Sequence, residues 1–196
     1  MTTANKVTII RILLIPFFVV ELIYYVRTGN EIHRLFALLS FAIAAILDGV
    51  DGYIARHYNQ KSELGAILDP LADKLLLVSA VVALTFDNKP YLGQIPLWLT
   101  GMILGRDLLL AIGAGVIHLV VGKIVVQPRL TGKLATVFQM VTISWILLRW
   151  DVDYNGLFLK SWILGSGIFT GVSGLFYVWD GSKQLSAHPA SSPKPG

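Results

Sequence analysis

Cysteine is absent from this chain of 196 residues, and charged side chains are scarce. Without a thiol the protein has no disulfide framework, no thiolate nucleophile and none of the soft ligands that zinc and copper prefer. Charged residues make up 14% of the chain, against about 25% in ordinary soluble domains. The net charge of +4 fits an anionic lipid surface or substrate, but the chain lacks the basic soluble face that nucleic acid requires. These deficits exclude a soluble domain, a disulfide scaffold and a nucleic-acid-binding protein.

Apolar residues, by contrast, make up 55% of the chain. A membrane-spanning helix needs about 20 apolar residues, so the length admits about six spans. We expect spans at residues 7–26, 32–56, 65–86, 95–120, 134–148 and 157–178. The predicted fold class is all-α, an integral membrane bundle formed by one domain over residues 1–183. Residues 184–196 are rich in Ser, Pro and Ala and are predicted to form a disordered cytoplasmic tail.

Two pairs of aspartates interrupt this apolar sequence, Asp48 with Asp51 and Asp69 with Asp73. Residues three or four apart share a helix face, so each pair forms one acidic edge. If the two helices are antiparallel neighbours, the four carboxylates converge and need a counter-charge. Oxygen ligands of this kind suit Mg²⁺, Mn²⁺ or Ca²⁺, and such a site handles phosphate. The alternative is that the acids are helix-boundary residues, with Asp73 in an ordinary ion pair with Lys74.

The spacing of these aspartates and of the residues between them resembles the signature of a known family. In order, the pattern is Asp48-x-x-Asp51-Gly52-x-x-Ala55-Arg56, then eight residues, then Gly65-x-x-x-Asp69-x-x-x-Asp73. It resembles the signature of the CDP-alcohol phosphatidyltransferase family and matches it at every signature position. The resemblance implies a CDP-linked lipid as donor, most simply CDP-diacylglycerol, which loses CMP as its phosphatidyl group passes to the hydroxyl of an acceptor alcohol.

The same resemblance implies roles for the signature residues. Asp48, Asp51 and Asp69 would bind Mg²⁺ or Mn²⁺, as two ions, with Asp73 as a shared ligand or as the catalytic base.

The remaining signature positions concern the nucleotide. Gly52, Ala55 and Gly65 are small where a nucleotide base must approach a helix, and Arg56 offers a fork for phosphate. The alternative for the small residues is close helix packing.

Near the N-terminus, the spacing Asn5-x-x-Thr8-x-x-Arg11 resembles the start of family members that make phosphatidylglycerophosphate. On that resemblance Thr8 joins the predicted nucleotide-binding residues. Asn5 and Thr8 could instead cap the helix, and Arg11 could extend to the lipid headgroups.

Basic residues favour a topology with both termini in the cytoplasm. This topology places the acidic motif at the cytoplasmic surface of a multi-pass protein of the cell's inner membrane. The spacings Gly101-x-x-x-Gly105 and Gly167-x-x-x-Gly171 allow close helix packing, within one chain or in a homodimer.

The acceptor is predicted from charge. A phosphomonoester needs cations distinct from Arg56, and Arg106, Arg129 and Lys133 are available, which favours glycerol 3-phosphate. Against this, the sequence Arg106-Asp107 resembles that of family members that make cardiolipin from phosphatidylglycerol. Family members that use glycerol 3-phosphate usually have Arg-Glu at this place.

Two other classes of membrane protein also use clustered carboxylates. An aspartate-rich prenyltransferase would resemble a longer bundle with differently spaced acids. A metal transporter would not need all its acids at one boundary beside Arg56.

Overall fold

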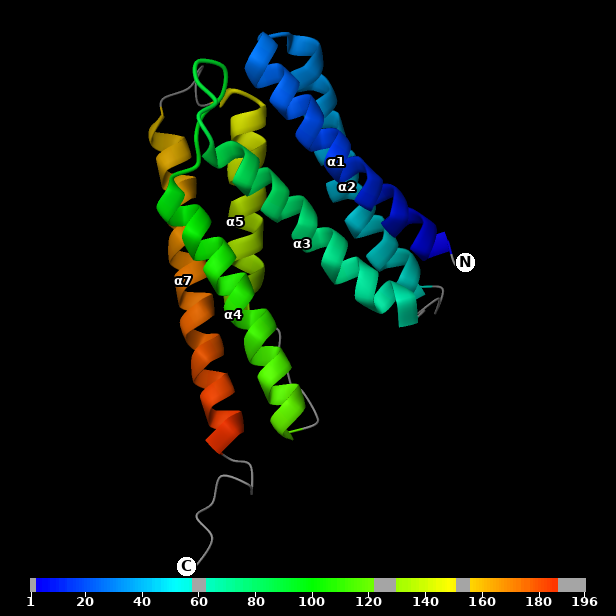
Figure 1. The fold of residues 1–196 in the computed structure, drawn as a ribbon, viewed down its shortest axis with the longest axis vertical. Coiled ribbons are helices and arrows are strands. Elements are labelled where there is room, and N and C mark those ends of the chain that lie inside the picture. Colours follow the sequence, from blue (N-terminus) through cyan, green and yellow to red (C-terminus); the bar gives the residue numbers. More distant parts are fainter. Residues whose placement is uncertain (1–2, 58–62, 122–129, 151–155, 187–196) are drawn as a thin grey trace, which may run out of the picture. The chain divides into compact units, whose positions relative to one another are not determined.

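The computed structural model describes residues 3–57, 63–121, 130–150 and 156–186. Side chains are described for most of these, except 3–6, 49–57, 63–67, 69, 70, 117–121 and 184–186. Within the described ranges six helices follow one another (Figure 1): α1 (Thr3–Thr28), α2 (Glu31–His57), α3 (Glu63–Thr85), α4 (Leu97–Val121), α5 (Leu130–Leu147) and α7 (Leu157–Ser186).

The expectation of an all-α membrane bundle is confirmed. Among the described residues, four helices contain segments long and apolar enough to cross a membrane: Val7–Thr28, Leu97–Val116, Leu130–Leu147 and Leu157–Lys183. In α2 the described side chains run only to Asp48 and include four ionisable groups, Glu31, His33, Arg34 and Asp48, so this part of the helix is less apolar. The protein is therefore a multi-pass membrane protein.

Three helix ends differ from the sequence-based expectation by four or more residues. Helix α1 begins at Thr3, four residues before the expected start at residue 7. Helix α5 begins at Leu130, four residues before the expected start, because the polar stretch up to Lys133 forms the first helical turn. Helix α7 continues to Ser186, eight residues beyond the expected end and past the boundary set at residue 183. There the ammonium of Lys183 lies 5.2 Å from the ring centre of Trp179, one turn earlier. Residues 187–196 lie outside the described part of the chain.

The chain divides into two compact units. The first comprises Met1–Ile95 and Ile143–Leu159, and the second comprises Pro96–Thr142 and Lys160–Gly196. Helices α1, α2 and α3 therefore belong to the first unit, and α4 to the second.

Helices α1 and α2 form an antiparallel pair in the first unit (Figure 1). The buried side chains of α1 recur at alternating spacings of three and four residues: Thr8, Arg11, Ile15, Phe18, Leu22 and Tyr25. On α2 the buried positions Ala37, Phe41 and Ala44 follow the same rule. Residues at these spacings share one helix face, so they form the interface between α1 and α2, which we call the α1–α2 seam. The rings of Phe18 and Phe41 meet across it with centroids 5.7 Å apart.

The link between α1 and α2 is short, and Gly29 and Asn30 determine its conformation. Gly29 has a φ of 70°, and its N–H donates to the Tyr25 carbonyl at 2.8 Å, which closes the end of α1. A Cβ at Gly29 would lie 2.6 Å from the ring of Tyr91, so glycine is required for space as well as for conformation. Asn30 then caps α2, since its Oδ1 accepts from the N–H of Ile32 at 3.1 Å.

Beside this link, the Glu31 carboxylate accepts hydrogen bonds from three side chains. Arg34 forms an ion pair with it one turn along α2, Arg149 donates to it at 2.9 Å, and Tyr25 Oη donates at 3.2 Å. Arg34 also donates to the Leu147 carbonyl at 3.2 Å. The C-terminal end of α5 is thereby attached to the α1–α2 link.

In the second unit, α7 packs on both α4 and α5. A Cβ at Gly167 would lie 2.7 Å from the Trp98 ring of α4, so this glycine allows a close approach. The side chains of Gln139 on α5 and Thr170 on α7 are buried and hydrogen-bond at 3.2 Å. Gly167-x-x-x-Gly171 therefore packs helices within the chain, one of the two uses expected of it.

The carboxylate of Glu31 predicts a pH-dependent contribution to stability. Its pKa lies below the usual 4.5, first because Arg34 donates a hydrogen bond to it, with smaller effects of Tyr25 and Arg149. A carboxyl with a lowered pKa in the folded state stabilises above its unfolded pKa, and this stabilisation is lost as pH falls through the folded pKa. We expect Glu31→Gln to lower the Tm at neutral pH, with the difference from wild type closing below pH 4.5.

The measurement is thermal unfolding of detergent-solubilised protein from pH 8 to pH 2.5. In an Arg34→Gln background the effect of Glu31→Gln should shrink, because the main donor is gone. A difference in Tm that is constant over the whole pH range would contradict this role of Glu31.

Candidate functional site

The α1–α2 seam ends in a charged pair. Arg11 follows the buried α1 spacing four residues before Ile15, and Asp48 follows the α2 spacing four residues after Ala44. Arg11 Nη1 donates to Asp48 Oδ1 in an ion pair. The arginine side chain is fully buried, whereas 41% of the aspartate side chain is exposed. The apolar seam thus gives way to an ion pair at the end of α2 that carries the acidic motif.

The burial of Arg11 constrains its partner. A guanidinium stays protonated in proteins, and removing it from water is costly unless an opposite charge compensates. Asp48 provides that charge. Of the alternatives left open by the sequence, the structure excludes the one in which Arg11 extends to the lipid headgroups, because the side chain is enclosed between helices.

Thr8 lies one turn before Arg11 on the same face of α1 and is also fully buried. It is therefore positioned next to the ion pair along the helix. Its predicted part in nucleotide binding remains a prediction.

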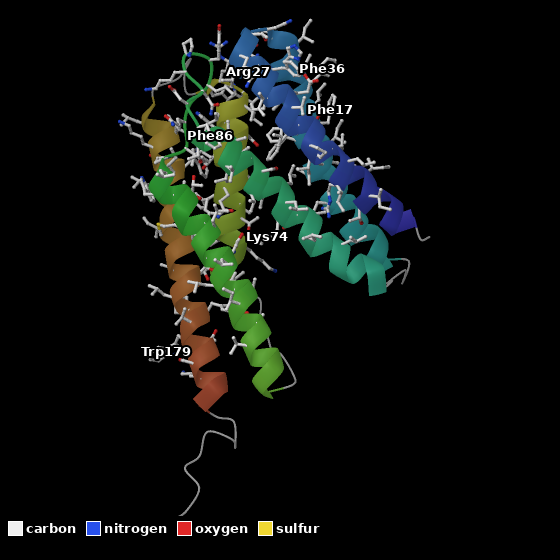
Figure 2. The ribbon with its side chains drawn as sticks, in the orientation of Figure 1. Phe17, Arg27, Phe36, Lys74, Phe86 and Trp179 are labelled. Atoms are coloured by element: carbon white, nitrogen blue, oxygen red, sulfur yellow. The ribbon has the colours of Figure 1, made fainter. Side chains whose placement is uncertain are left out.

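Asp73 lies on α3, the third helix of the first unit. It follows the fully buried Ala72 and precedes the buried Leu76, and its own side chain is half-buried. Figure 2 shows the place of Lys74, the next residue, on this helix. Helix α1 contacts α2 and α3, and α2 contacts α3, so Asp48 and Asp73 lie on neighbouring helices.

The other signature residues have helical backbones as expected, but their side chains lie outside the described set. Asp51, Gly52, Ala55 and Arg56 belong to the end of α2, and Gly65 and Asp69 to the start of α3. The link over residues 58–62 is outside the described ranges too. The expected convergence of four carboxylates therefore stays a prediction.

The predicted acceptor residues belong to the second unit. Arg106 on α4 donates to Asp107 at 2.8 Å and to Ser173 Oγ of α7 at 3.0 Å, and 12% of its side chain is exposed. Lys133, on the first turn of α5, is exposed. Arg129 lies outside the described residues. The binding of an acceptor phosphate by these residues stays a prediction.

The donor set suits a divalent cation. Among the described side chains no three of His, Cys, Asp or Glu come together, and Asp51 and Asp69 are not among those described. Asp48 and Asp73 offer carboxylate oxygens, the ligands that Mg²⁺ and Mn²⁺ prefer. Arg11 provides one positive charge to Asp48 and leaves part of that carboxylate accessible, so a cation can still approach it.

Two side-chain contacts of the candidate site residues were not predicted from the sequence. The pairing of Arg11 with Asp48 had a signal, because both residues extend the buried spacing of their helices, but the register between the helices was not known. The contact of Arg106 with Ser173 joins residues 67 apart and had no signal in the sequence.

Comparisons with known proteins place the chain among named relatives. The family model of the CDP-alcohol phosphatidyltransferases matches residues 1–173. Over 146 residues the chain is 38% identical to a probable phosphatidylglycerophosphate synthase of Mycobacterium tuberculosis (strain CDC 1551 / Oshkosh), covering 74% of this chain and 65% of the relative. The chain thus spans less than two thirds of that relative's length.

Two further relatives are covered more fully, and both are named CDP-diacylglycerol–glycerol-3-phosphate 3-phosphatidyltransferase. The protein of Aquifex aeolicus (strain VF5) is 31% identical over 94% of this chain and 98% of its own length. That of Escherichia coli (strain K12) is 33% identical over 78% of this chain and 81% of its own length.

The buried ion pair predicts strong coupling between its two residues. Replacing one partner of a buried pair leaves the other uncompensated, at a cost of about 3–5 kcal/mol. We expect Asp48→Asn to reduce the free energy of unfolding more than Arg11→Gln does, because Arg11 is fully buried whereas Asp48 is partly exposed.

The measurement is a double-mutant cycle by unfolding in SDS, with the exposed Lys89→Gln as control. The coupling energy should exceed about 1 kcal/mol, whereas the control should change stability by less than about 0.5 kcal/mol. Additive effects of the two substitutions would show that the pair does not stabilise the fold.

Proposed function

The chain belongs to the CDP-alcohol phosphatidyltransferase family, and from this premise we propose that it transfers the phosphatidyl group of CDP-diacylglycerol to glycerol 3-phosphate, releasing CMP. The observation that carries the proposal is the complete aspartate signature on α2 and α3, with Asp48 paired to a buried arginine. The names of the relatives from Aquifex aeolicus and Escherichia coli support the choice of substrates.

The family generally uses a divalent metal. We assign Mg²⁺ or Mn²⁺, as two ions, to Asp48, Asp51, Asp69 and Asp73. Bound there, the metal would neutralise the diphosphate of the donor and the charge that develops on the departing CMP. Arg11 maintains the position of Asp48 whether or not a cation is present, since its own burial requires the carboxylate.

The transfer itself needs a base and an orienting site. The acceptor hydroxyl oxygen forms a new bond to the phosphorus of the phosphatidyl group, the bond from that phosphorus to the CMP oxygen breaks, and the hydroxyl proton passes to a carboxylate oxygen of Asp73. Arg56 orients a phosphate of the nucleotide. Gly52, Ala55 and Gly65 would leave space for the base of the nucleotide, and Thr8 on α1 is assigned to the same nucleotide site.

Arg106, Arg129 and Lys133 are assigned to the acceptor phosphate. The phosphate of glycerol 3-phosphate carries nearly two negative charges at neutral pH, which cations at this site would compensate.

One observation favours a second acceptor. The charge of Arg106 is already offset by Asp107 at 2.8 Å, which suits an acceptor of lower charge. Cardiolipin synthesis from phosphatidylglycerol is therefore the second candidate.

The proposal extends to location and assembly. The acidic motif would face the cytoplasm at the inner membrane, in a domain over residues 1–183. Gly101 and Gly105 on α4 would mediate a homodimer, a proposal supported by the open space that a Cβ at either position would meet.

The metal assignment predicts a loss of turnover on removing one ligand charge. Asp48→Asn, Asp51→Asn and Asp69→Asn should each abolish CMP release from CDP-diacylglycerol, and so should chelation of the metal. Asp73→Asn should reduce kcat while sparing nucleotide binding. Activity of Asp69→Asn within tenfold of wild type, about 1.4 kcal/mol of barrier, would refute the ligand assignment. Metal flux into vesicles without CMP release would identify a transporter instead.

The acceptor is tested by supplying glycerol 3-phosphate and phosphatidylglycerol in separate assays. Lys133→Ala and Arg106→Ala should raise the KM for glycerol 3-phosphate by about tenfold or more, the loss of one charge-assisted contact. Val137→Ala, an exposed apolar position on α5, is the control and should leave KM unchanged. Conversion of phosphatidylglycerol with none of glycerol 3-phosphate would establish the second candidate and reject the first.

A further inference from the structure

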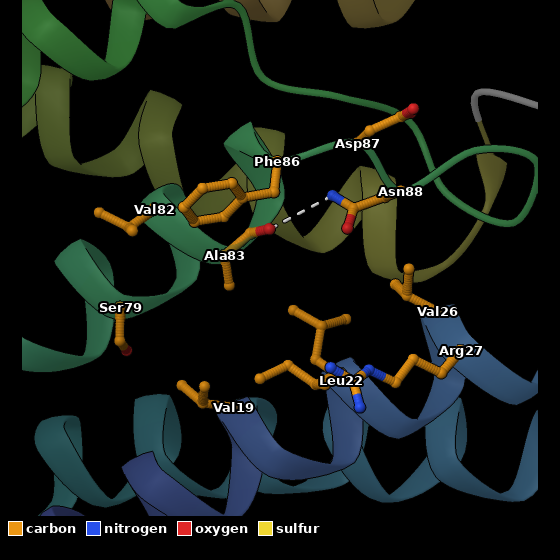
Figure 3. A pocket seen from close by; sticks show the side chains of 11 residues that line it. Val19, Leu22, Val26, Arg27, Ser79, Val82, Ala83, Phe86, Asp87 and Asn88 are labelled. Atoms are coloured by element: carbon orange, nitrogen blue, oxygen red, sulfur yellow. Dashed lines mark hydrogen bonds between the residues drawn. The ribbon is translucent and has the colours of Figure 1, made fainter.

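The neutral polar side chains in the pocket of the first unit are hydrogen-bonded, whereas the guanidinium of Arg106 in the second unit is only partly so. The pocket lies between α1 and α3 (Figure 3), and its lining includes Ser79 and Asn88. Ser79 Oγ donates to the Leu76 carbonyl at 2.9 Å, and the Asn88 amide donates to the Ala83 carbonyl at 3.3 Å. Arg106, by contrast, has a buried N–H, that of Nε, with no hydrogen-bond partner among the described residues. It therefore requires an acceptor that these residues do not supply.

The Arg106 side chain lies between three helices of the second unit, and 12% of it is exposed. Its Nη1 donates to Asp107, the next residue on α4, at 2.8 Å. Its Nη2 donates to Ser173 Oγ of α7 at 3.0 Å. On α5, a Cβ built at Gly132 would lie 3.0 Å from Arg106 Nη2 and 3.4 Å from Ser173 Oγ. The Nη2 end of the guanidinium thus faces both α5 and α7.

The unpaired donor lies on an edge of the guanidinium that suits an oxyanion. Nε and Nη2 share this edge, and their N–H groups form a fork that matches two oxygens of one carboxylate or phosphate group. In Arg106 the Ser173 hydroxyl accepts from Nη2, but no described residue accepts from Nε. A buried polar atom without a partner is unusual in native proteins and calls for one, such as a bound ion. The single oxygen of Ser173 pairs one arm of the fork, so the edge fits a group that offers two oxygens.

The charges beside this edge favour an anion with two negative charges. Arg106 and Lys133 are positive, and Asp107 is negative. Gly132 and Lys133 lie in the first turn of α5, whose N-terminal end adds about half a positive charge. A phosphomonoester carries nearly two negative charges at neutral pH, whereas the phosphodiester of phosphatidylglycerol carries one. The surplus of positive charge among these groups therefore favours the monoester.

Gly132 gives the guanidinium this position. Glycine is a poorer helix former than alanine, so a glycine in α5 needs a reason in packing or in function. A Cβ at 3.0 Å from Nη2 would be closer than ordinary van der Waals contact, and a shift of the guanidinium would strain its two hydrogen bonds. Two other glycines lack this constraint. A Cβ at Gly174 would make ordinary contact with Arg106 Cγ at 3.6 Å, and one at Gly115 would meet nothing within 4 Å.

We propose that the Nε–Nη2 edge of Arg106 binds the phosphate of the acceptor, that Ser173 Oγ marks the position of one phosphate oxygen, and that Gly132 is a specificity-determining residue that leaves space for it. This inference rests on the proposed transfer to glycerol 3-phosphate and names the contact that recognises that acceptor. One phosphate oxygen accepts from Nη2 and a second from Nε, while Asp107 stays on Nη1. The displaced Ser173 hydroxyl donates to the Phe169 carbonyl, one turn earlier on α7, a bond that serine makes in helices.

The first experiment measures the KM for glycerol 3-phosphate in three glycine variants of the full chain, with CDP-diacylglycerol and metal present. Gly132→Ala should raise this KM by about tenfold, the loss of one charge-assisted contact, and change the KM for CDP-diacylglycerol by less than about twofold. Gly115→Ala and Gly174→Ala should leave both KM values unchanged, because a Cβ there does not approach the guanidinium nitrogens. Alanine is the better helix former, so the Tm of Gly132→Ala should not fall. Equal KM values in the three variants would overturn the role of Gly132.

The second experiment tests the fork. Arg106→Lys keeps the charge but lacks the paired N–H groups, so it should raise the KM for glycerol 3-phosphate as much as Arg106→Ala does. Ser173→Ala removes the hydroxyl that the phosphate displaces and should lower this KM by roughly threefold. A wild-type KM in Arg106→Lys would overturn the two-oxygen contact, and a raised KM in Ser173→Ala would overturn the position assigned to the phosphate.

The wild-type reaction in the same assays separates this inference from the proposed function. If wild type converts glycerol 3-phosphate and Gly132→Ala and Arg106→Lys leave its KM unchanged, the inference fails and the proposed function stands. If wild type converts phosphatidylglycerol and no glycerol 3-phosphate, both fail, because the acceptor is then a phosphodiester.

Discussion

The burial of one positive charge is the constraint on which the first unit depends. Arg11 has no exposed surface and lies where the α1–α2 seam requires an apolar residue. A guanidinium cannot lose its charge there, so α2 must present a carboxylate at the facing position, and Asp48 does so. This requirement fixes the register of α2 against α1 and, with it, the place of the motif that begins at Asp48. One ion pair thus serves both the fold and the site.

The two ends of the α1–α2 pair use charge in different ways. At the end with the link, Glu31 is about half exposed, and its bonds to Arg34 and Arg149 are partly screened by water. These contacts attach the end of α5 rather than supply much stability. At the other end, Arg11 is buried in its ion pair with Asp48. Screening by water is weak there, so an uncompensated charge is costly. The site therefore lies at the end where charges are most strongly coupled.

The helices were predictable because their limits have local causes. Gly29 and Asn30 end one apolar run and cap the next, so the link was expected within a few residues of its observed place. The start of α5 was not predictable from the sequence. Its first turn is polar, and only helical hydrogen bonding shows that this turn belongs to the helix. Contacts between helices were less predictable. The sequence contains Arg11 and Asp48, but periodicity gives a face of each helix and not the register that brings two faces together.

Arg11 and Arg106 differ in a way that bears on the proposed acceptor. Arg11 relies on a carboxylate from another helix, so an incoming anion that displaced it would loosen the α1–α2 seam. Arg106 pairs with its neighbour in the chain, and its second nitrogen donates to the neutral hydroxyl of Ser173. A hydrogen bond to a neutral group is about half as strong as one to a charged group. A phosphate can therefore replace Ser173 at Arg106 without separating Arg106 from Asp107, so the ion pair does not by itself exclude a phosphorylated acceptor. Selectivity between glycerol 3-phosphate and phosphatidylglycerol then rests on whether further cations, such as Lys133, compensate the second negative charge of the phosphate.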